Sequence, residues 1–260
     1  MHPMSWQAAA LVFLGYLAAT TAVLRGMTRA RRLSALAFIA SGAAVLAVSW
    51  LLPATHPLNN WILPPSLLFI GYWASGRFFV APMPVLERGL IDIDRALGID
   101  AIAARMPVVV VEILEIAYTF VYPLVPIGLF LALHEGIAAE RYWAIVLITD
   151  FICFGMLPWF QTRPPRSVGV PSPWNSRWRS LNLQVLDASS VQVNTFPSGH
   201  AAEGLAVALL LAGAPAPIPV VMFFCALAIS AGAVFGRYHY AADALAGWAV
   251  ALAVFFSIGR

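Results

Sequence analysis

Eight apolar runs alternate with polar breaks along the chain, and each is close to the length of a membrane-spanning helix. A helix needs about 20 mostly apolar residues to cross the hydrocarbon core. The runs cover residues 6–24, 33–52, 61–80, 107–133, 142–160, 198–214, 219–235 and 243–258. Pro64, Pro65 and Arg77 interrupt the third run, so we expect seven or eight spans. The pattern predicts an all-α fold, a polytopic helical bundle in a membrane.

Two segments do not fit a spanning helix. In residues 84–106, Leu86, Leu90 and Leu97 alternate with charged side chains, which is typical of an amphipathic helix lying at the membrane interface. Residues 161–195 are polar and rich in proline, and a segment of this length predicts an ordered cap over a site. We therefore divide the chain into N-terminal spans (1–83), an interfacial helix (84–106) and a catalytic helical core (107–260).

Composition supports the membrane assignment. The chain of 260 residues is 61% hydrophobic and 10% charged, with a mean hydropathy of +0.83. A soluble domain carries roughly a quarter charged residues. These values exclude a water-soluble domain, a disordered chain, a collagen and a disulfide scaffold. Cys153 and Cys225 lie inside apolar runs and are expected to pack there, so neither a disulfide nor a metal site is predicted.

The positive charge is carried by arginine alone. The formal net charge is +3, and all fifteen basic residues are Arg. Guanidinium groups hold phosphate oxygens in a planar fork, and so few charges favour lipid headgroups over nucleic acid as partners. Alternating spans put most Arg residues on one face, which the positive-inside rule predicts to be cytoplasmic. We expect an integral protein of a bacterial inner (plasma) membrane.

A Pro-Ser-Gly-His sequence stands immediately before the sixth apolar run. Pro197 and Gly199 favour a tight turn, and the free N–H groups of the following helix can then bind a phosphate oxygen. His200 is placed to protonate a leaving oxygen. The alternative is that Ser198 acts only as a helix cap.

A second candidate element is Arg237 to Asp243. His239 and Asp243 are four residues apart, so on a helix the carboxylate can accept a hydrogen bond from one ring N–H. The other ring nitrogen is then available as a base or nucleophile. The alternative is a structural pair at a helix start, but an ionisable pair at the mouth of an apolar segment favours a function.

A third element, Thr162 to Arg166, closes the fifth apolar run. Arg163 and Arg166 could clamp a phosphate or could anchor the helix end at the interface.

The order of these three elements resembles the type 2 phosphatidic acid phosphatase superfamily. The resemblance covers residues 142–260, and the Pro-Ser-Gly-His turn and the His-x-x-x-Asp element are its most specific parts. The earlier segment 91–100, followed by an apolar helix with Tyr118 and Pro123, is similar to the branch that contains inositol phosphorylceramide synthases.

The resemblance implies a role for each site residue. His239 would be the nucleophile that takes the phosphoryl group, Asp243 would orient it, and His200 would be the general acid. Arg163, Ser198 and the Gly199 amide would cradle the phosphate. No metal or other cofactor is implied.

Two phosphate ligands of the superfamily pattern are missing. Met156 stands where the pattern has Lys, and Ala233 where it has Arg. Arg166 and Arg237 are nearby candidates to replace them. Loss of these cations is similar to sphingomyelin and inositol phosphorylceramide synthases, which transfer a phospho-headgroup between lipids.

The remaining acids in apolar runs are expected to be structural. We expect Glu112, Glu115 and Asp150 to pair with Arg or with buried hydroxyls, and Glu203 to support the helix start or an Arg.

The sequence predicts a membrane enzyme that hydrolyses a phosphoester or pyrophosphate of a lipid through a phosphohistidine. The alternative from the same chemistry is a lipid headgroup phosphotransferase, and the alternative from another class is a non-catalytic lipid-binding or transport protein. The phosphorylated lipid and the oligomeric state stay open.

Overall fold

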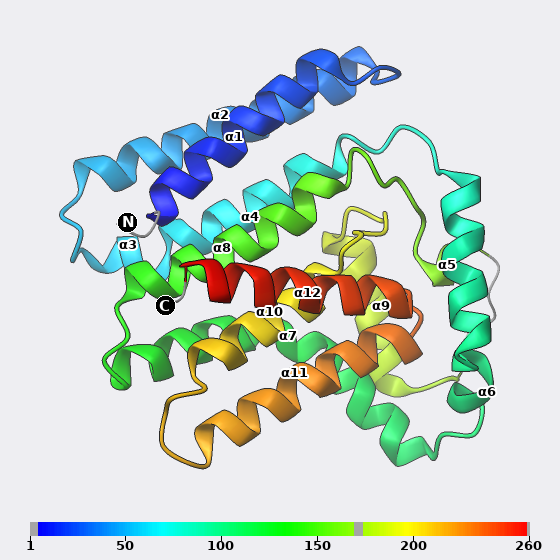
Figure 1. Ribbon diagram of the computed structural model, residues 1–260. Coiled ribbons are helices and arrows are strands. Elements are labelled where there is room, and N and C mark those ends of the chain that lie inside the picture. Colours follow the sequence, from blue (N-terminus) through cyan, green and yellow to red (C-terminus); the bar gives the residue numbers. More distant parts are fainter. Residues whose placement is uncertain (1–4, 169–173, 259–260) are drawn as a thin grey trace.

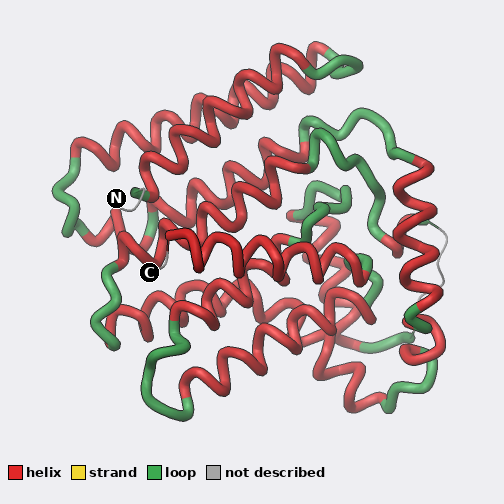
Figure 2. Tube along the Cα trace, viewed as in Figure 1, coloured by secondary structure: helices red, strands yellow, loops and turns green. Residues whose placement is uncertain are grey.

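The computed structural model describes residues 5–168 and 174–258, and within these ranges the regular structure is helical, with one isolated bridge between Thr162 and Asn194 (Figure 2). The helices are α1 (Trp6–Val23), α2 (Arg29–Leu51), α3 (Pro57–Trp61), α4 (Leu63–Gly76), α5 (Pro84–Ala96), α6 (Ile99–Ala103), α7 (Val108–His134), α8 (Ala139–Met156), the 3-10 turn η1 (Pro165–Ser167), α9 (Arg177–Ser189), α10 (Gly199–Leu210), α11 (Ile218–Phe235) and α12 (Ala241–Ile258). The predicted all-α membrane bundle is confirmed.

The eight apolar runs become α1, α2, α4, α7, α8, α10, α11 and α12. Among the described helices, α1, α2, α7, α11 and α12 are long and apolar enough to cross a membrane. The other three fall short: α4 has 14 residues, α10 has 12, and α8 carries Glu140, Arg141 and Asp150. By length and composition, five of the eight predicted runs form full spans within the described residues; α4 and α10 are too short, and α8 carries three charged side chains.

Helix α10 lies at the centre of the bundle and packs against α7, α8, α11 and α12 (Figure 1). Its sequence is apolar nearly all round, as expected of a helix surrounded by others. The close approach of α12 to the start of α10 depends on a small residue. A Cβ added at Gly247 of α12 would lie 2.4 Å from the Ser198 carbonyl oxygen, so α12 can approach the turn before α10 only with glycine at this position.

The helices α1 and α2 form a hairpin along one side of the bundle (Figure 1). Large apolar side chains on this hairpin are exposed, including Val12, Val23, Leu33 and Trp50. Exposed apolar surface of this extent is typical of a face in contact with lipid.

Helices α5, α6 and α9 lie across one end of the bundle, away from the chain termini (Figure 1). The predicted interfacial helix 84–106 is broken into α5 and α6 at Gly98, whose φ of +67° favours glycine. Glu87, Leu90 and Asp94 form the buried face of α5, while Val85 is 75% exposed. Two acids of this segment thus face the protein, where the sequence pattern predicted a polar face toward water.

Candidate active site

The Pro-Ser-Gly-His turn begins α10, as predicted. The Ser198 hydroxyl accepts a hydrogen bond from the Ala201 N–H at 3.4 Å, so Ser198 is the N-cap of the helix. A Cβ at Gly199 would lie 3.0 Å from the Phe154 ring and 3.3 Å from an Asp150 oxygen. The cap and the close packing account for Ser198 and Gly199 structurally, and the helix N-terminus still favours an anion beside it.

The His239 and Asp243 side chains face each other at the start of α12. The His239 Nδ1 lies 3.4 Å from Asp243 Oδ2, which also accepts the Tyr240 N–H at 2.8 Å. This contact is not a hydrogen bond in the structure, since His239 Nδ1 has no hydrogen-bond partner among the described residues, but the carboxylate is placed to accept one when the ring gains charge. With Nδ1 directed to the carboxylate, Nε2 is the nitrogen left for chemistry.

The two imidazole rings come together although 39 positions separate them in the sequence. The ring centroids of His200 and His239 are 5.9 Å apart. Tyr118 of α7 stacks on His200 at 5.1 Å and on Tyr238 at 3.9 Å, so one aromatic ring supports both histidine segments. The two predicted histidines are therefore neighbours in the fold.

Main-chain hydrogen bonds join the three predicted elements in pairs, one of them through Asn194, three residues before Pro197. Each element contributes at least one N–H or C=O to a bond with another, and the lengths lie in the normal range for N–H···O. The bonds join Asn194 N–H to Thr162 O at 3.0 Å, Ser198 N–H to Asp243 O at 2.9 Å, and Arg166 N–H to Arg237 O at 3.1 Å.

Two of the three candidate phosphate-binding arginines pair with acids of the segment 84–106. Arg163 binds the Glu87 carboxylate through Nε at 3.0 Å and Nη2 at 2.8 Å. Arg237 is buried and forms ion pairs with Asp94 and with Asp100. Their charges are therefore largely compensated before any substrate binds. Arg163 and Arg237 were expected beside the phosphate; in this structure their guanidinium groups face these acids.

Arg166 is the predicted cation whose charge acts on the histidines. Its guanidinium lies 5.8 Å from the Tyr238 ring centroid. Burial, together with the nearby Arg166 charge, lowers the pKa of His239 from 6.5 to about 3. His239 is thus neutral at physiological pH, the form that a nucleophile requires.

Neither of the two positions that depart from the superfamily pattern has a charged side chain. Met156 is the last residue of α8. Ala233 is fully buried and packs with Tyr118 and Tyr238, and its carbonyl oxygen accepts the N–H groups of Tyr238 and His239 at 2.9 Å each. Position 233 therefore shapes the loop that holds His239 through its main chain.

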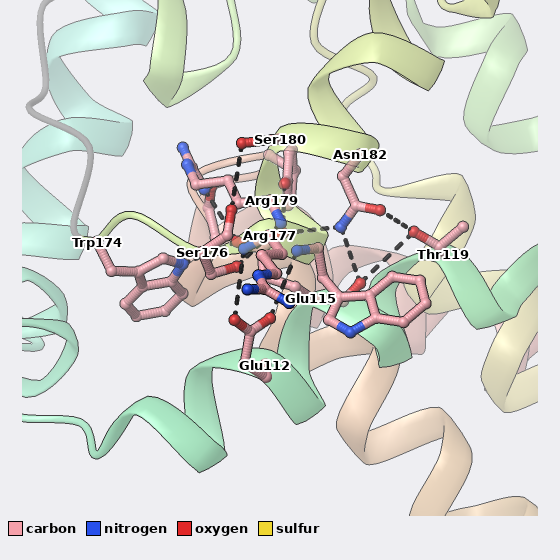
Figure 3. Close-up of polar contacts among 12 residues, drawn as sticks. Glu112, Glu115, Thr119, Trp174, Ser176, Arg177, Arg179, Ser180 and Asn182 are labelled. Carbon is pink, nitrogen blue, oxygen red and sulfur yellow. Dashed lines mark hydrogen bonds and ion pairs between the residues drawn. The ribbon is translucent and has the colours of Figure 1, made fainter.

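Glu115 fastens the cap helix α9 to the bundle (Figure 3). Its carboxylate accepts bonds from Trp174, Asn182 and Tyr238 and pairs with Arg179 at 3.1 Å. The prediction that Glu115 pairs with an Arg and a buried hydroxyl is confirmed. Glu112, one turn earlier, accepts the N–H groups of Arg177 and Trp178 at the start of α9, both at 3.4 Å.

Asp150 does not pair with an Arg or a buried hydroxyl in the described ranges, although the sequence predicts such a pair. It is 1% exposed, and neither carboxylate oxygen has a hydrogen-bond partner among the described residues. Asp150 and Glu203 instead line an aromatic cavity of about 290 Å³ that also reaches His200. Within the described part of the chain, no three His, Cys, Asp or Glu side chains are grouped so as to hold a metal ion.

The fold and this site define a helical membrane protein with two close imidazoles, a supporting carboxylate and arginines at one end of the bundle. Residues 88–257 match the family described as the PAP2 superfamily, and the chain belongs to this superfamily. No curated protein and no solved structure matches the chain.

Proposed function

We propose that the protein is an integral membrane enzyme that cleaves a phosphoester or pyrophosphate of a lipid through a phosphohistidine on His239. Membership in the PAP2 superfamily supports a lipid enzyme of the phosphatase or phosphotransferase type. The observation that carries the finer proposal is the pair of imidazoles 5.9 Å apart, with Asp243 behind one of them.

In the first step, His239 Nε2 attacks phosphorus, the P–N bond forms, and the P–O bond to the leaving group breaks. His200 donates a proton to the leaving oxygen. Burial lowers the pKa of the free His200 ring to about 3, so the ring takes up this proton only when the anionic substrate binds beside it. Asp243 accepts the Nδ1 hydrogen and stabilises the positive ring that results. The helix N-terminus at Gly199 and the Arg166 charge stabilise the equatorial oxygens of the transition state.

In the second step, water attacks phosphorus and the P–N bond breaks. His200, now neutral, takes the proton of the attacking water and returns to its starting form, and His239 is regenerated as a neutral ring. The cycle leaves the lipid alcohol and phosphate as products, or the corresponding lipid phosphate when the substrate is a pyrophosphate.

A phosphotransferase is the second candidate, and the charge of the site favours it. Arg163 and Arg237 are paired with acids, and Met156 and Ala233 replace the cations of the superfamily pattern. A phosphodiester carries one negative charge where a monoester carries up to two, so a site with fewer free cations suits the diester better. An alcohol of a second lipid or polyol would then take the place of water, as in the inositol phosphorylceramide synthase-like branch.

The experiment uses purified full-length protein in lipid nanodiscs with radiolabelled phospholipids. We expect the His239→Gln variant to lose turnover by at least about 10³-fold and to form no acid-labile phosphoenzyme. His134→Gln is the control, since His134 lies in the last turn of α7 and is exposed. Free phosphate as product supports hydrolysis, and a new phosphodiester in the presence of an added alcohol supports transfer. Full activity in His239→Gln would rule out this nucleophile.

A further inference from the structure

A cavity lies beside His200 and is bounded by α4, α7, α8 and α10. Its volume is about 290 Å³, and its walls are mostly aromatic and aliphatic, including Trp61, Tyr72, Trp143 and Phe154. Such walls suit the apolar portion of a lipid.

Two carboxyl groups stand in these apolar walls. Asp150 comes from α8 and Glu203 from α10, and these two helices pack against each other. Asp150 is 1% exposed and has no hydrogen-bond partner at either oxygen within the described residues. A buried carboxyl group without partners is costly, so a ligand that offers hydrogen-bond donors would be stabilised here.

The cavity reaches only one side of the candidate active site. His200 and Gly199 line it, whereas His239 and Asp243 do not. In an in-line displacement the leaving oxygen departs opposite the attacking nitrogen of His239, which is the side of the proton donor His200. The cavity is therefore placed to receive the alcohol portion of the substrate.

We propose that Asp150 and Glu203 form a subsite for a second hydrogen-bond donor on the lipid alcohol, a hydroxyl or amine a few bonds from the reacting oxygen. Asp150 lies at the level of this reacting oxygen, since its carboxylate is 3.3 Å from the Cβ position of Gly199, next to His200. Glu203 follows His200 by three residues on α10 and extends the polar strip into the cavity. The choice of the alcohol portion as ligand rests on the proposed function; the preference for donor groups rests on the two acids alone.

The test measures binding, so that it does not depend on turnover. Sphinganine and octadecanol have the same chain length, but only sphinganine carries an amine and a second hydroxyl near its terminal hydroxyl. Trp61, Trp73 and Trp143 line the cavity and report occupancy through intrinsic fluorescence. We expect the His239→Gln protein to bind sphinganine at least about tenfold more tightly than octadecanol, because a site built around polar groups rejects the analogue that lacks them.

Adding Asp150→Asn or Glu203→Gln should reduce this preference to below about threefold. Glu140→Gln is the matched control, an acid on α8 that lies outside the cavity and accepts the Trp6 N–H, and it should keep the preference. Thermal unfolding in the same nanodiscs shows which variants are folded. Equal affinity for the two alcohols in the folded parent, or a preference that survives both substitutions, would overturn the proposed subsite. Neither result affects the phosphohistidine, which is tested separately by His239→Gln.

Discussion

At the residue scale, the site depends on how each charged group is compensated. His239 is buried near the Arg166 charge, and burial is the main cause of its low pKa. Hydrogen bonds from Arg163 lower the pKa of Glu87, while burial raises the pKa of Asp94 despite its contact with Arg237. The candidate site therefore combines a neutral His239, the proposed nucleophile, with two arginines that are already paired, and it leaves Arg166 as the candidate to bind the phosphate.

The depressed pKa of His239 predicts how stability changes with pH. The ring has a pKa of 6.5 when unfolded and about 3 when folded, so between these values the unfolded chain binds the extra proton. This contribution to stability is complete above about pH 7 and is lost as the pH falls. The stability lost between about pH 7 and about pH 5 amounts to about 2 kcal/mol.

The measurement is the free energy of unfolding of the detergent-solubilised protein over this pH range. The decline with falling pH should be shallower in His239→Gln than in the parent, and His134→Gln should follow the parent. A His239→Gln curve parallel to the parent would show that the ring is not held neutral.

The sequence predicted the candidate catalytic residues better than it predicted the acids that pair with the arginines. His200, His239 and Asp243 stand in local patterns whose spacing constrains geometry, and the structure brings them together. The acids that bind Arg163 and Arg237 lie on α5 and α6, 76 or more residues away in the chain, and no local pattern relates such distant positions. Asp150 and Glu203 were expected to be structural because an apolar run does not reveal a cavity.

At the scale of elements, the buried Glu115 carboxylate makes several of the contacts that hold the cap helix α9. Arg179, 5% exposed, inserts under the bundle end, where Glu115 neutralises it and the Gly236 carbonyl accepts a second bond at 2.7 Å. The same carboxylate binds Tyr238, next to His239. The position of α9 and that of the histidine loop therefore depend on one side chain of α7.

Substitution of this carboxylate should loosen the cap. Glu115→Gln leaves Arg179 as a buried charge without a counter-ion, and we expect a loss of about 3 kcal/mol in the free energy of unfolding. Trypsin cleavage in α9 should become faster than in the parent. Glu112→Gln on the same helix is the control and should change both quantities little, since Glu112 contacts exposed N–H groups at 3.4 Å. Equal cleavage rates in the two variants would contradict the role of Glu115.

The helices agree with the predicted apolar runs where hydrophobicity alone determines the structure. The apolar runs at α2, α7 and α11 became long helices. Prolines at the start of α4 and acids in α8 altered the outcome, because the bundle interior tolerates short or partly polar helices that are covered by others. The break between α5 and α6 follows from a left-handed glycine, which hydrophobic periodicity does not register.

At the scale of the whole molecule, the functional groups gather at the bundle end that α5, α6 and α9 cover (Figure 1). Asp94 links this cover to the nucleophile loop on both sides of His239. Its Oδ1 accepts the Ala241 N–H at 2.9 Å, and its Oδ2 lies 3.6 Å from Arg237. Helix α5 thus positions the loop that carries His239.

Asp94→Asn should therefore lower activity by changing the position of the loop that carries His239. We expect kcat to fall by about tenfold or more with little change in KM, because the loop loses the ion pair between Arg237 and Asp94 and keeps only that with Asp100, while the cavity beside His200 is untouched. Asp92→Asn is the matched control, since Asp92 pairs with Arg95 at the surface of the same helix and should leave both constants unchanged. A rise in KM with unchanged kcat would show instead that Asp94 acts on substrate binding.

The links among Thr162, Ser198 and Arg237 and their partners have a consequence for how such enzymes diverge. Peptide groups hold these segments together, so an exchange of side chains around the proposed phosphate site need not disturb them. Lysine and arginine can give way to Met156 and Ala233 while the imidazoles keep their mutual placement. Related proteins could in this way come to bind headgroups of different charge while the backbone of the site stays the same.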